Sequence, residues 1–215
     1  MINQDLYEKY FQHLLQGDRP ACTKIVQNLL DKNVDIKSLY VDLFQKSLYK
    51  IGELWEYNKI TVAREHMVTA LTESLMSMVY PYLFEISTSK EISRKALISC
   101  TANEHHQVGG KMVADIFEMQ GWDTHFLGAN TPTDHMLSYI QEIKPDILGL
   151  SLSVYFNLPS LKNELEAVRT DFRNIDILVG GQAFKWGGTE LLKKYPGTSF
   201  IQSLDSLETQ IKEIS

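Results

Sequence analysis

Residues 95–101, KALISCT, are the run that decides the fold, because apolar residues dominate it and a polar loop follows at once. A helical pattern follows the loop, through Met112 and Phe117, and strand-like and helical segments then alternate to the end of the chain. The other strand-like runs are THFL at 124–127, DILGLSLS at 146–153, IDILVGG at 175–181 and TSFI at 198–201. Five strands that alternate with helices predict an α/β domain over residues 95–215, with a flavodoxin-like (Rossmann-type) parallel sheet.

The N-terminal part of the chain has a different pattern, in which apolar residues recur at helical spacing. Leu6, Tyr10 and Leu14 step by four, as one face of a helix does. Four such helices with short loops predict an all-α bundle over residues 1–88. Residues 86–94, ISTSKEISR, are polar and non-periodic, and we expect them to link the two domains.

Composition and net charge favour a globular protein and argue against a nucleic-acid-binding or membrane protein. The 215 residues suffice for two compact domains, and 44% hydrophobic with 22% charged residues is ordinary for a globular protein. A net charge of −6 without a Lys/Arg run argues against direct binding of nucleic acid. Cys22 and Cys100 form no metal-ligand pattern, and no apolar stretch is long enough to span a membrane. We therefore expect a soluble cytoplasmic protein that does not associate with membranes.

The loop after the first strand carries the strongest chemical signal. In doubly wound sheets, ligands bind outside the carboxyl ends of the strands. Glu104 and His106 project to the same side of an extended loop, so Glu104 could hold one ring nitrogen while the other binds a metal. Gly109 would let the chain turn into the next helix close to a bulky ligand. The alternative is a loop histidine that is hydrogen-bonded to Glu104 and binds no metal.

Two further strand ends carry small or polar residues. Ser151 and Ser153 follow the third strand, where a hydroxyl could hydrogen-bond Glu104 or a ligand. The fourth strand ends in Gly180 and Gly181 and leads to Phe184, and a glycine pair allows a planar group to lie against bare backbone. Taken singly, the serine could be an ordinary edge hydroxyl and the glycines a tight turn.

The combined order E-x-H-x-x-G, S-x-S and G-G resembles the cobalamin-binding domain family, whose signature is D-x-H-x-x-G, S-x-L and G-G. The segment 126–132, FLGANTP, is also similar to this family. The resemblance implies that cobalamin binds base-off, with its nucleotide tail between sheet and helices. It implies that His106 is the lower ligand of cobalt, with Glu104 and Ser151 as its hydrogen-bond relay. Gly109, Gly180 and Gly181 would make room for the tail.

Two positions depart from that signature. Glu104 stands where many members have Asp, which lengthens the arm of the relay by one methylene group. Ser153 stands where many members have Leu, which makes the expected tail channel more polar. Neither change removes the histidine ligand.

The helical part resembles the corresponding domain of CarH-type photoreceptors. Trp55, Val62, Glu65 and His66 reproduce that subfamily's spacing of a Trp, a Val seven residues on, and a Glu-His pair three residues later. The resemblance implies that Trp55 and Val62 enclose an adenosyl group and that Glu65 accepts hydrogen bonds from its ribose. The alternative is that Trp55 anchors a helix end and Val62 belongs to the core. Glu56 stands where the subfamily has a histidine.

The resemblance implies a sensor rather than an enzyme. Adenosylcobalamin is the favoured cofactor, with methylcobalamin and hydroxocobalamin as alternatives. Because the chain begins with the bundle, without the subfamily's DNA-binding domain, its light response should pass through a partner such as a transcription regulator or signalling protein. A homo-oligomer through the bundle is a further expectation. The alternatives are a corrinoid methyl-carrier subunit of a methyltransferase system, against which Trp55 with Glu65 and His66 argues, and a storage protein.

Overall fold

The computed structural model describes residues 2–87 and 92–214, and the chain divides into two compact units, Met1–Glu85 and Ile86–Ser215. The expected linker at 86–94 is only partly described, because residues 88–91 lie outside the described ranges. The last helix of the first unit continues to Ser87, into the first residues of the expected linker.

The first unit is helical, as predicted. Its elements are α1 (Gln4–Gln16), α2 (Arg19–Leu30), α3 (Ile36–Leu39), the π-helical segment η1 (Tyr40–Gln45), α4 (Lys46–Glu56) and α5 (Val62–Ser87). Local signals set the first boundary: Gly17 ends α1 at a φ of 75°, and the Asp18 side chain caps α2 by accepting a hydrogen bond from the Ala21 amide.

The third predicted helix is interrupted by the π segment η1, which the apolar spacing did not indicate. The wider turn leaves Tyr40, Leu43 and Phe44 all fully buried. Phe44 lies 6.0 Å from the Tyr40 ring and 6.3 Å from the Tyr10 ring, centroid to centroid. This aromatic cluster packs α1 against η1 in the core of the bundle.

Helix α5 is the longest element and is tied to the first two helices by polar contacts. Arg64 Nη1 donates to the Leu15 carbonyl at 2.8 Å, and Gln27 Nε2 donates to Tyr82 Oη at 2.9 Å. Among the helices of the described residues, none has the length and apolar character required to cross a membrane.

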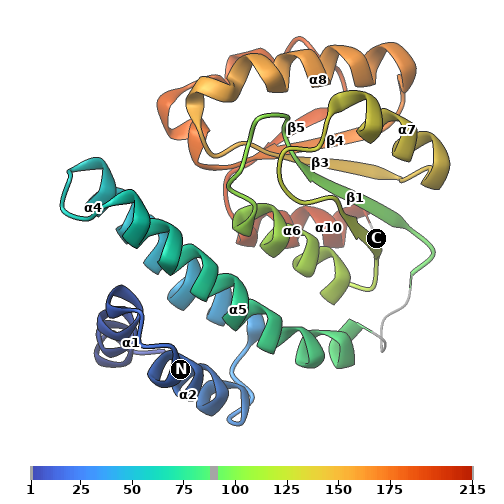
Figure 1. The fold of residues 1–215 in the computed structure, drawn as a ribbon. Helices are drawn as coiled ribbons and strands as arrows, with labels where there is room; N and C mark the ends of the chain where they lie inside the picture. Colours follow the sequence, from blue (N-terminus) through green and yellow to red (C-terminus); the bar gives the residue numbers. More distant parts are fainter. Residues whose placement is uncertain (1, 88–91, 215) are drawn as a thin grey trace. The chain divides into compact units, whose positions relative to one another are not determined.

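The second unit is a parallel sheet flanked by helices. Its strands are β1 (Lys95–Cys100), β2 (Asp123–Phe126), β3 (Ile147–Ser151), β4 (Asp176–Gly180) and β5 (Thr198–Ile201), in the order β2-β1-β3-β4-β5. The principal helices are α6 (Val108–Met119), α7 (Thr133–Ile143), α8 (Leu158–Asp171), α9 (Thr189–Leu192) and α10 (Leu204–Ile214). Figure 1 shows α7 and α8 on one face of the sheet and α6 and α10 on the other. The predicted flavodoxin-like fold is therefore confirmed.

The strand register aligns the loops that carry the candidate site. Cys100 pairs with Ser151, and Ser151 pairs with Gly180, so β1, β3 and β4 end at the same edge of the sheet. The strand order reverses between β1 and β3, and open α/β sheets bind ligands at such a switch point. The fully buried residues Leu97, Leu150 and Val179 anchor these strands in the core.

Candidate functional site

Glu104 and His106 meet in the loop after β1, as the sequence predicted. The His106 ring Nδ1 lies 2.6 Å from Glu104 Oε1, and the His106 backbone N–H donates to the same oxygen at 3.0 Å. The Glu104 side chain is fully buried, whereas the His106 side chain is 53% exposed. A buried carboxylate therefore orients a ring whose body reaches the surface of its unit.

The second oxygen of Glu104 binds the loop after β3. Glu104 Oε2 accepts hydrogen bonds from the backbone amides of Ser153 at 2.9 Å and Val154 at 2.8 Å. The Asn157 side-chain amide lies 3.5 Å from the same oxygen. Glu104 thus joins the two loops that flank the topological switch point.

These hydrogen bonds determine the ionisation of Glu104. Burial by itself would raise its pKa, but the hydrogen bonds from the His106 ring, the His106 amide and the Val154 amide outweigh burial and lower the pKa to about 2. An ionised carboxylate can only accept, so His106 Nδ1 carries the shared proton. In the neutral ring, Nε2 is then the nitrogen with a lone pair for a metal.

Asparagines fix the rest of the loop, and the sequence interpretation missed them. Asn103 has a φ of 66° and Asn130 a φ of 50°, a left-handed conformation that asparagine tolerates better than most residues. The Asn103 amide donates to Asn130 Oδ1 at 2.8 Å, and the Asn130 amide donates to the Glu104 carbonyl at 2.9 Å. Asn157 Nδ2 donates to the Asn103 carbonyl at 3.0 Å. Three loops are therefore cross-linked around the histidine.

The predicted site glycines differ in what surrounds them. A Cβ on Gly109, in the first turn of α6, would meet no atom within 4 Å, so its neighbourhood is open to a ligand. Gly181 has a φ of 121°, and a Cβ there would collide with the Leu152 carbonyl. A Cβ on Gly180 would lie 3.1 Å from the Ile201 carbonyl. The fold itself therefore requires Gly181, whereas it does not require Gly109.

The expected hydrogen bond between Ser151 and Glu104 is not formed among the described residues, which corrects the proposed relay. The physical reason is the alternation of side chains along β3. Ser151 Cβ lies 3.5 Å from where a Cβ of Gly110 on α6 would stand, so Ser151 faces α6. Ser153 contributes its backbone amide to Glu104, and a direct role of either serine toward a ligand stays a prediction.

Phe184 occupies the core rather than an open surface. Its side chain is 8% exposed, belongs to the hydrophobic cluster on the α7–α8 face and packs 5.1 Å from the Phe200 ring, centroid to centroid. The sequence had placed it only in the loop after β4. Its contact with a cofactor therefore stays a prediction, and its structural role is packing.

The four predicted residues of the first unit lie at the end of α4 and the start of α5. Trp55 is 48% and Val62 49% exposed within the described structure, so Val62 is not a core residue of the bundle. Glu65 Oε2 lies 2.5 Å from His66 Nδ1, and the Thr69 hydroxyl donates to Glu65 Oε1 at 2.9 Å. Thr69 is an orienting partner of Glu65 that the motif did not contain.

The described residues contain no group of three or more histidine, cysteine, aspartate or glutamate side chains that could hold a metal ion. A single oriented histidine such as His106 can supply one ligand to a metal whose other ligands belong to a cofactor. Cobalt in a corrin ring is such a metal, since the macrocycle supplies the equatorial nitrogens. The oriented ring of His106 and the open space at Gly109 fit this group.

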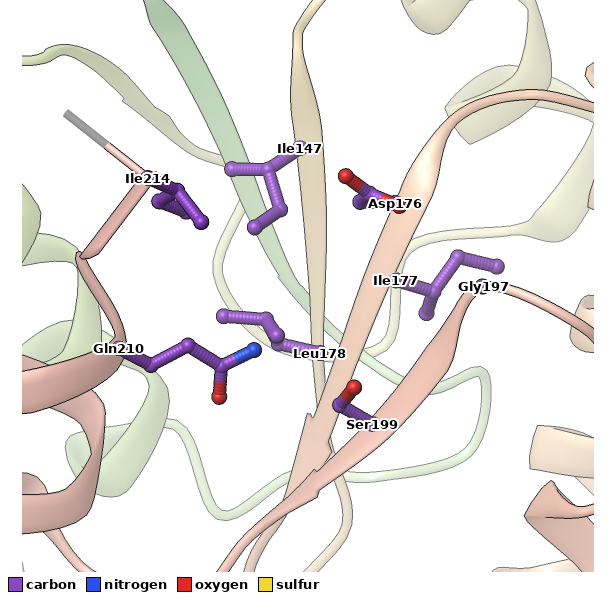
Figure 2. A pocket seen from close by; sticks show the side chains of 8 residues that line it. All are labelled: Ile147, Asp176, Ile177, Leu178, Gly197, Ser199, Gln210 and Ile214. Atoms are coloured by element: carbon purple, nitrogen blue, oxygen red, sulfur yellow. The ribbon is translucent and has the colours of Figure 1, made fainter.

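A separate hollow of about 130 Å³ lies beside α10, at the end of the sheet opposite to the His106 loop. Figure 2 shows the side chains of Ile147, Leu178 and Ile214 around it, at the amino ends of the strands. Sites for drug-sized ligands measure roughly 300–1,000 Å³. The hollow is too small for a corrinoid and lies at the opposite end of the strands from His106.

The fold and site together define an α/β module with one histidine, oriented by a buried carboxylate, at its topological switch point. The chain belongs to the B12 binding domain family, whose profile matches residues 94–203. A second profile, also described as B12 binding domain, matches residues 6–80. Both units are therefore covered by the matches.

Curated relatives include two regulators and a corrinoid protein. The HTH-type transcriptional repressor CarA of Myxococcus xanthus is 32% identical over 94 residues, which are 43% of this chain and 31% of the relative. CarH of the same organism is 23% identical over 168 residues, 77% of this chain and 54% of the relative. Dimethylamine corrinoid protein 1 of Methanosarcina acetivorans is 20% identical over 135 residues, 61% of this chain and 62% of the relative. The chain thus spans between about a third and three fifths of these relatives.

Solved structures support the fold. The Methanosarcina barkeri monomethylamine corrinoid protein matches with a TM-score of 0.85 and 12% identity, over 100% of both chains. The methanol:cobalamin methyltransferase complex MtaBC of the same organism matches with a TM-score of 0.52 and 13% identity, over 99% of this chain and 80% of the other. At these identities the likeness concerns the fold alone.

Proposed function

We propose that this chain is a non-enzymatic sensor that binds adenosylcobalamin, responds to light and passes its output to a partner protein. The single observation that carries cofactor binding is the His106 ring, held at 2.6 Å by the fully buried Glu104. Such a carboxylate–histidine pair fixes the ring orientation and raises the basicity of the ligating nitrogen. When bound, the cofactor would supply a light-sensitive cobalt–carbon bond, and the chain would supply its orientation.

The cap residues support the adenosyl form. Trp55 and Val62 offer exposed apolar surface at adjoining helix ends, and Glu65 offers carboxylate oxygens that are already oriented by Thr69. A carboxylate can accept hydrogen bonds from ribose hydroxyls, and an aromatic ring can cover an apolar-edged group. Sequence similarity to CarA and CarH supports a regulatory role, with a transcription regulator or signalling protein as the partner.

A corrinoid methyl carrier is the second candidate. It is favoured by the match to a monomethylamine corrinoid protein over the whole of both chains and by the sequence similarity to dimethylamine corrinoid protein 1. A methyl group is small and has no hydroxyls, so a carrier does not need the acceptor at Glu65. The preference for one cofactor form therefore separates the two functions.

Titration with hydroxocobalamin tests the site. The purified protein should give the absorption spectrum of base-off cobalamin with a histidine ligand. His106→Ala should abolish that spectrum or weaken binding strongly, whereas His105→Ala, the matched control in the same loop, should change little. Equal effects of the two substitutions would show that the ligand is assigned to the wrong residue.

Illumination tests the sensor. The protein loaded with adenosylcobalamin should show a spectral change in light together with a change in oligomeric state or in binding to its partner. If it binds methylcobalamin and adenosylcobalamin equally well and light changes neither assembly nor partner binding, the methyl-carrier function is the better one.

A further inference from the structure

Glu164, on α8, is a second fully buried glutamate that contacts the His106 loop. Its Oε1 accepts a hydrogen bond from the Ala102 backbone amide at 2.6 Å. Ala102 lies in the first turn of that loop, one residue beyond Thr101, which follows the end of β1. The carboxyl group therefore fixes the start of the loop, as Glu104 fixes its middle.

The two buried glutamates differ in their hydrogen bonding. Glu104 accepts from backbone amides and side chains at both oxygens. Glu164 accepts one hydrogen bond, and its Oε2 is buried without a partner among the described residues. The hydroxyl of Thr101, the residue before Ala102, is likewise buried and unpartnered. A buried carboxylate with a single donor is costly, and protonation removes the larger part of that cost, which is the buried charge.

The charged surroundings of Glu164 also favour the neutral form. Cys100 at the end of β1 interacts electrostatically with both Glu104 and Glu164, and its own pKa is raised to about 12, first by burial and then by these two carboxyls. Glu104 is negative at neutral pH. In the described part of the chain, no cationic side chain pairs with Glu164. The elements packed against α8 also carry Asp134, His135, Tyr139, Glu142 and Tyr155, none of which forms a hydrogen bond or ion pair with Glu164.

We propose that Glu164 is a positioning residue that holds the His106 loop in its ligand-binding geometry while its carboxyl group is protonated, and releases it on ionisation. The proposal rests on the proposed function, because it concerns binding of cobalt by His106. Ionisation would place an uncompensated charge in a buried site that already holds the Glu104 carboxylate. The Ala102 hydrogen bond favours the carboxylate but does not offset the cost of burying its charge, so ionisation would favour an opened loop in which water solvates Glu164.

The pKa of Glu164 places this change in the physiological range. Burial raises the pKa to about 7, against the smaller opposing effect of the Ala102 hydrogen bond. For a pKa near 7, the protonated fraction falls from roughly nine tenths at pH 6 to roughly one tenth at pH 8. Apparent affinity scales with the fraction of protein in the competent state, so binding should weaken by up to about tenfold over this range.

The test compares hydroxocobalamin binding at pH 6 and pH 8 in wild type and Glu164→Gln. Gln is neutral at both pH values and keeps an oxygen that can accept the Ala102 N–H. Protonation of His106 affects both proteins alike, so it cancels in the ratio of their affinities. Between pH 6 and pH 8, the affinity of the wild type for hydroxocobalamin should fall by up to about tenfold relative to the affinity of Glu164→Gln. Glu166→Gln, at an exposed position of the same helix, should behave as wild type.

A second measurement needs neither a variant nor the cofactor. The Ala102 amide proton, followed by NMR in the wild-type protein, should titrate with a midpoint near pH 7 because it donates to Glu164. The proposal would be overturned if the chemical shift of the Ala102 amide proton did not change with pH. It would also be overturned if binding responded to pH in the same way in wild type and Glu164→Gln. A wild type that does not bind hydroxocobalamin at either pH would instead overturn the proposed function and the link to His106. The cofactor-free Ala102 titration distinguishes these two failures.

Discussion

Glu104 Oε1 lies 2.6 Å from His106 Nδ1, while the other oxygen of the same carboxylate is held by the backbone amides of Ser153 and Val154. The orientation of the histidine therefore depends on a loop about 50 residues further along the chain. Since that loop follows β3 and the histidine follows β1, the carboxylate couples the site to the packing of the central strands.

Glu104→Gln should destabilise the protein at neutral pH. The folded-state pKa of Glu104 is lowered from 4.5 to about 2, which corresponds to about 3 kcal/mol of unfolding free energy. Because the pKa is depressed, this contribution is full above the unfolded-state pKa of 4.5 and is lost as the pH falls toward 2. Urea unfolding of both proteins at pH 7 and pH 3 measures it. A difference in unfolding free energy that does not shrink at pH 3 would contradict the assignment.

Gly109→Ala should lower cobalamin affinity, whereas Gly181→Ala should lower the stability of the fold. A methyl group at Gly109 meets nothing within 4 Å, so stability should stay within about 1 kcal/mol while cobalamin affinity falls. Gly181→Ala forces a φ of 121° and a collision with the Leu152 carbonyl, and should cost at least about 1–3 kcal/mol. Thermal unfolding of the cofactor-free proteins and hydroxocobalamin titration separate the two effects. Unchanged cobalamin affinity in Gly109→Ala would exclude the space beside α6 as part of the site.

Glu65→Ala should reduce the preference for adenosylcobalamin over methylcobalamin. If the ribose hydrogen bonds are buried in the complex, their loss should cost roughly 1 to 3 kcal/mol of binding free energy. Thr69→Val removes the hydroxyl that orients Glu65 and should cause a smaller loss in the same direction. Titration of each protein with both cofactors measures the preference. A wild type without any preference would favour the methyl-carrier function.

Glu56→His should change the illuminated spectrum. The wild type has a carboxylate at the exposed C-terminal end of α4, at the position where CarH-type photoreceptors have a histidine. A carboxylate matches oxidised cobalt less well than imidazole does, so we expect no bis-histidine spectrum from the wild type through this position. Glu56→His should produce one after illumination. A bis-histidine spectrum in the wild type that survives His66→Ala would refute both this inference and the assigned cap.

The interior of the sheet was predictable because its signals are local. Apolar runs bounded by polar loops indicated all five strands within a residue or two of their observed bounds. The contact between Glu104 and His106 was predictable for the same reason, since two residues separated by one position in a loop can face the same side. The π segment η1 was not predicted, because it changes the helical period without changing the apolar pattern.

The partners that complete the site were decided only by tertiary structure. Ser151 was expected to bind Glu104, but its position in β3 turns it toward α6, and amides further along take its place. Asn157 and Glu164 reach the loop across 53 and 62 residues of sequence. Periodicity in a sequence determines which face of an element is buried, so the sequence by itself determined most of the elements and their order, and the short spacing in the loop after β1 determined the pairing of Glu104 with His106. Which buried polar groups meet depends on strand register and helix packing, so the three-dimensional fold alone decided the amides that bind the second oxygen of Glu104 and the contact of Glu164 with the His106 loop.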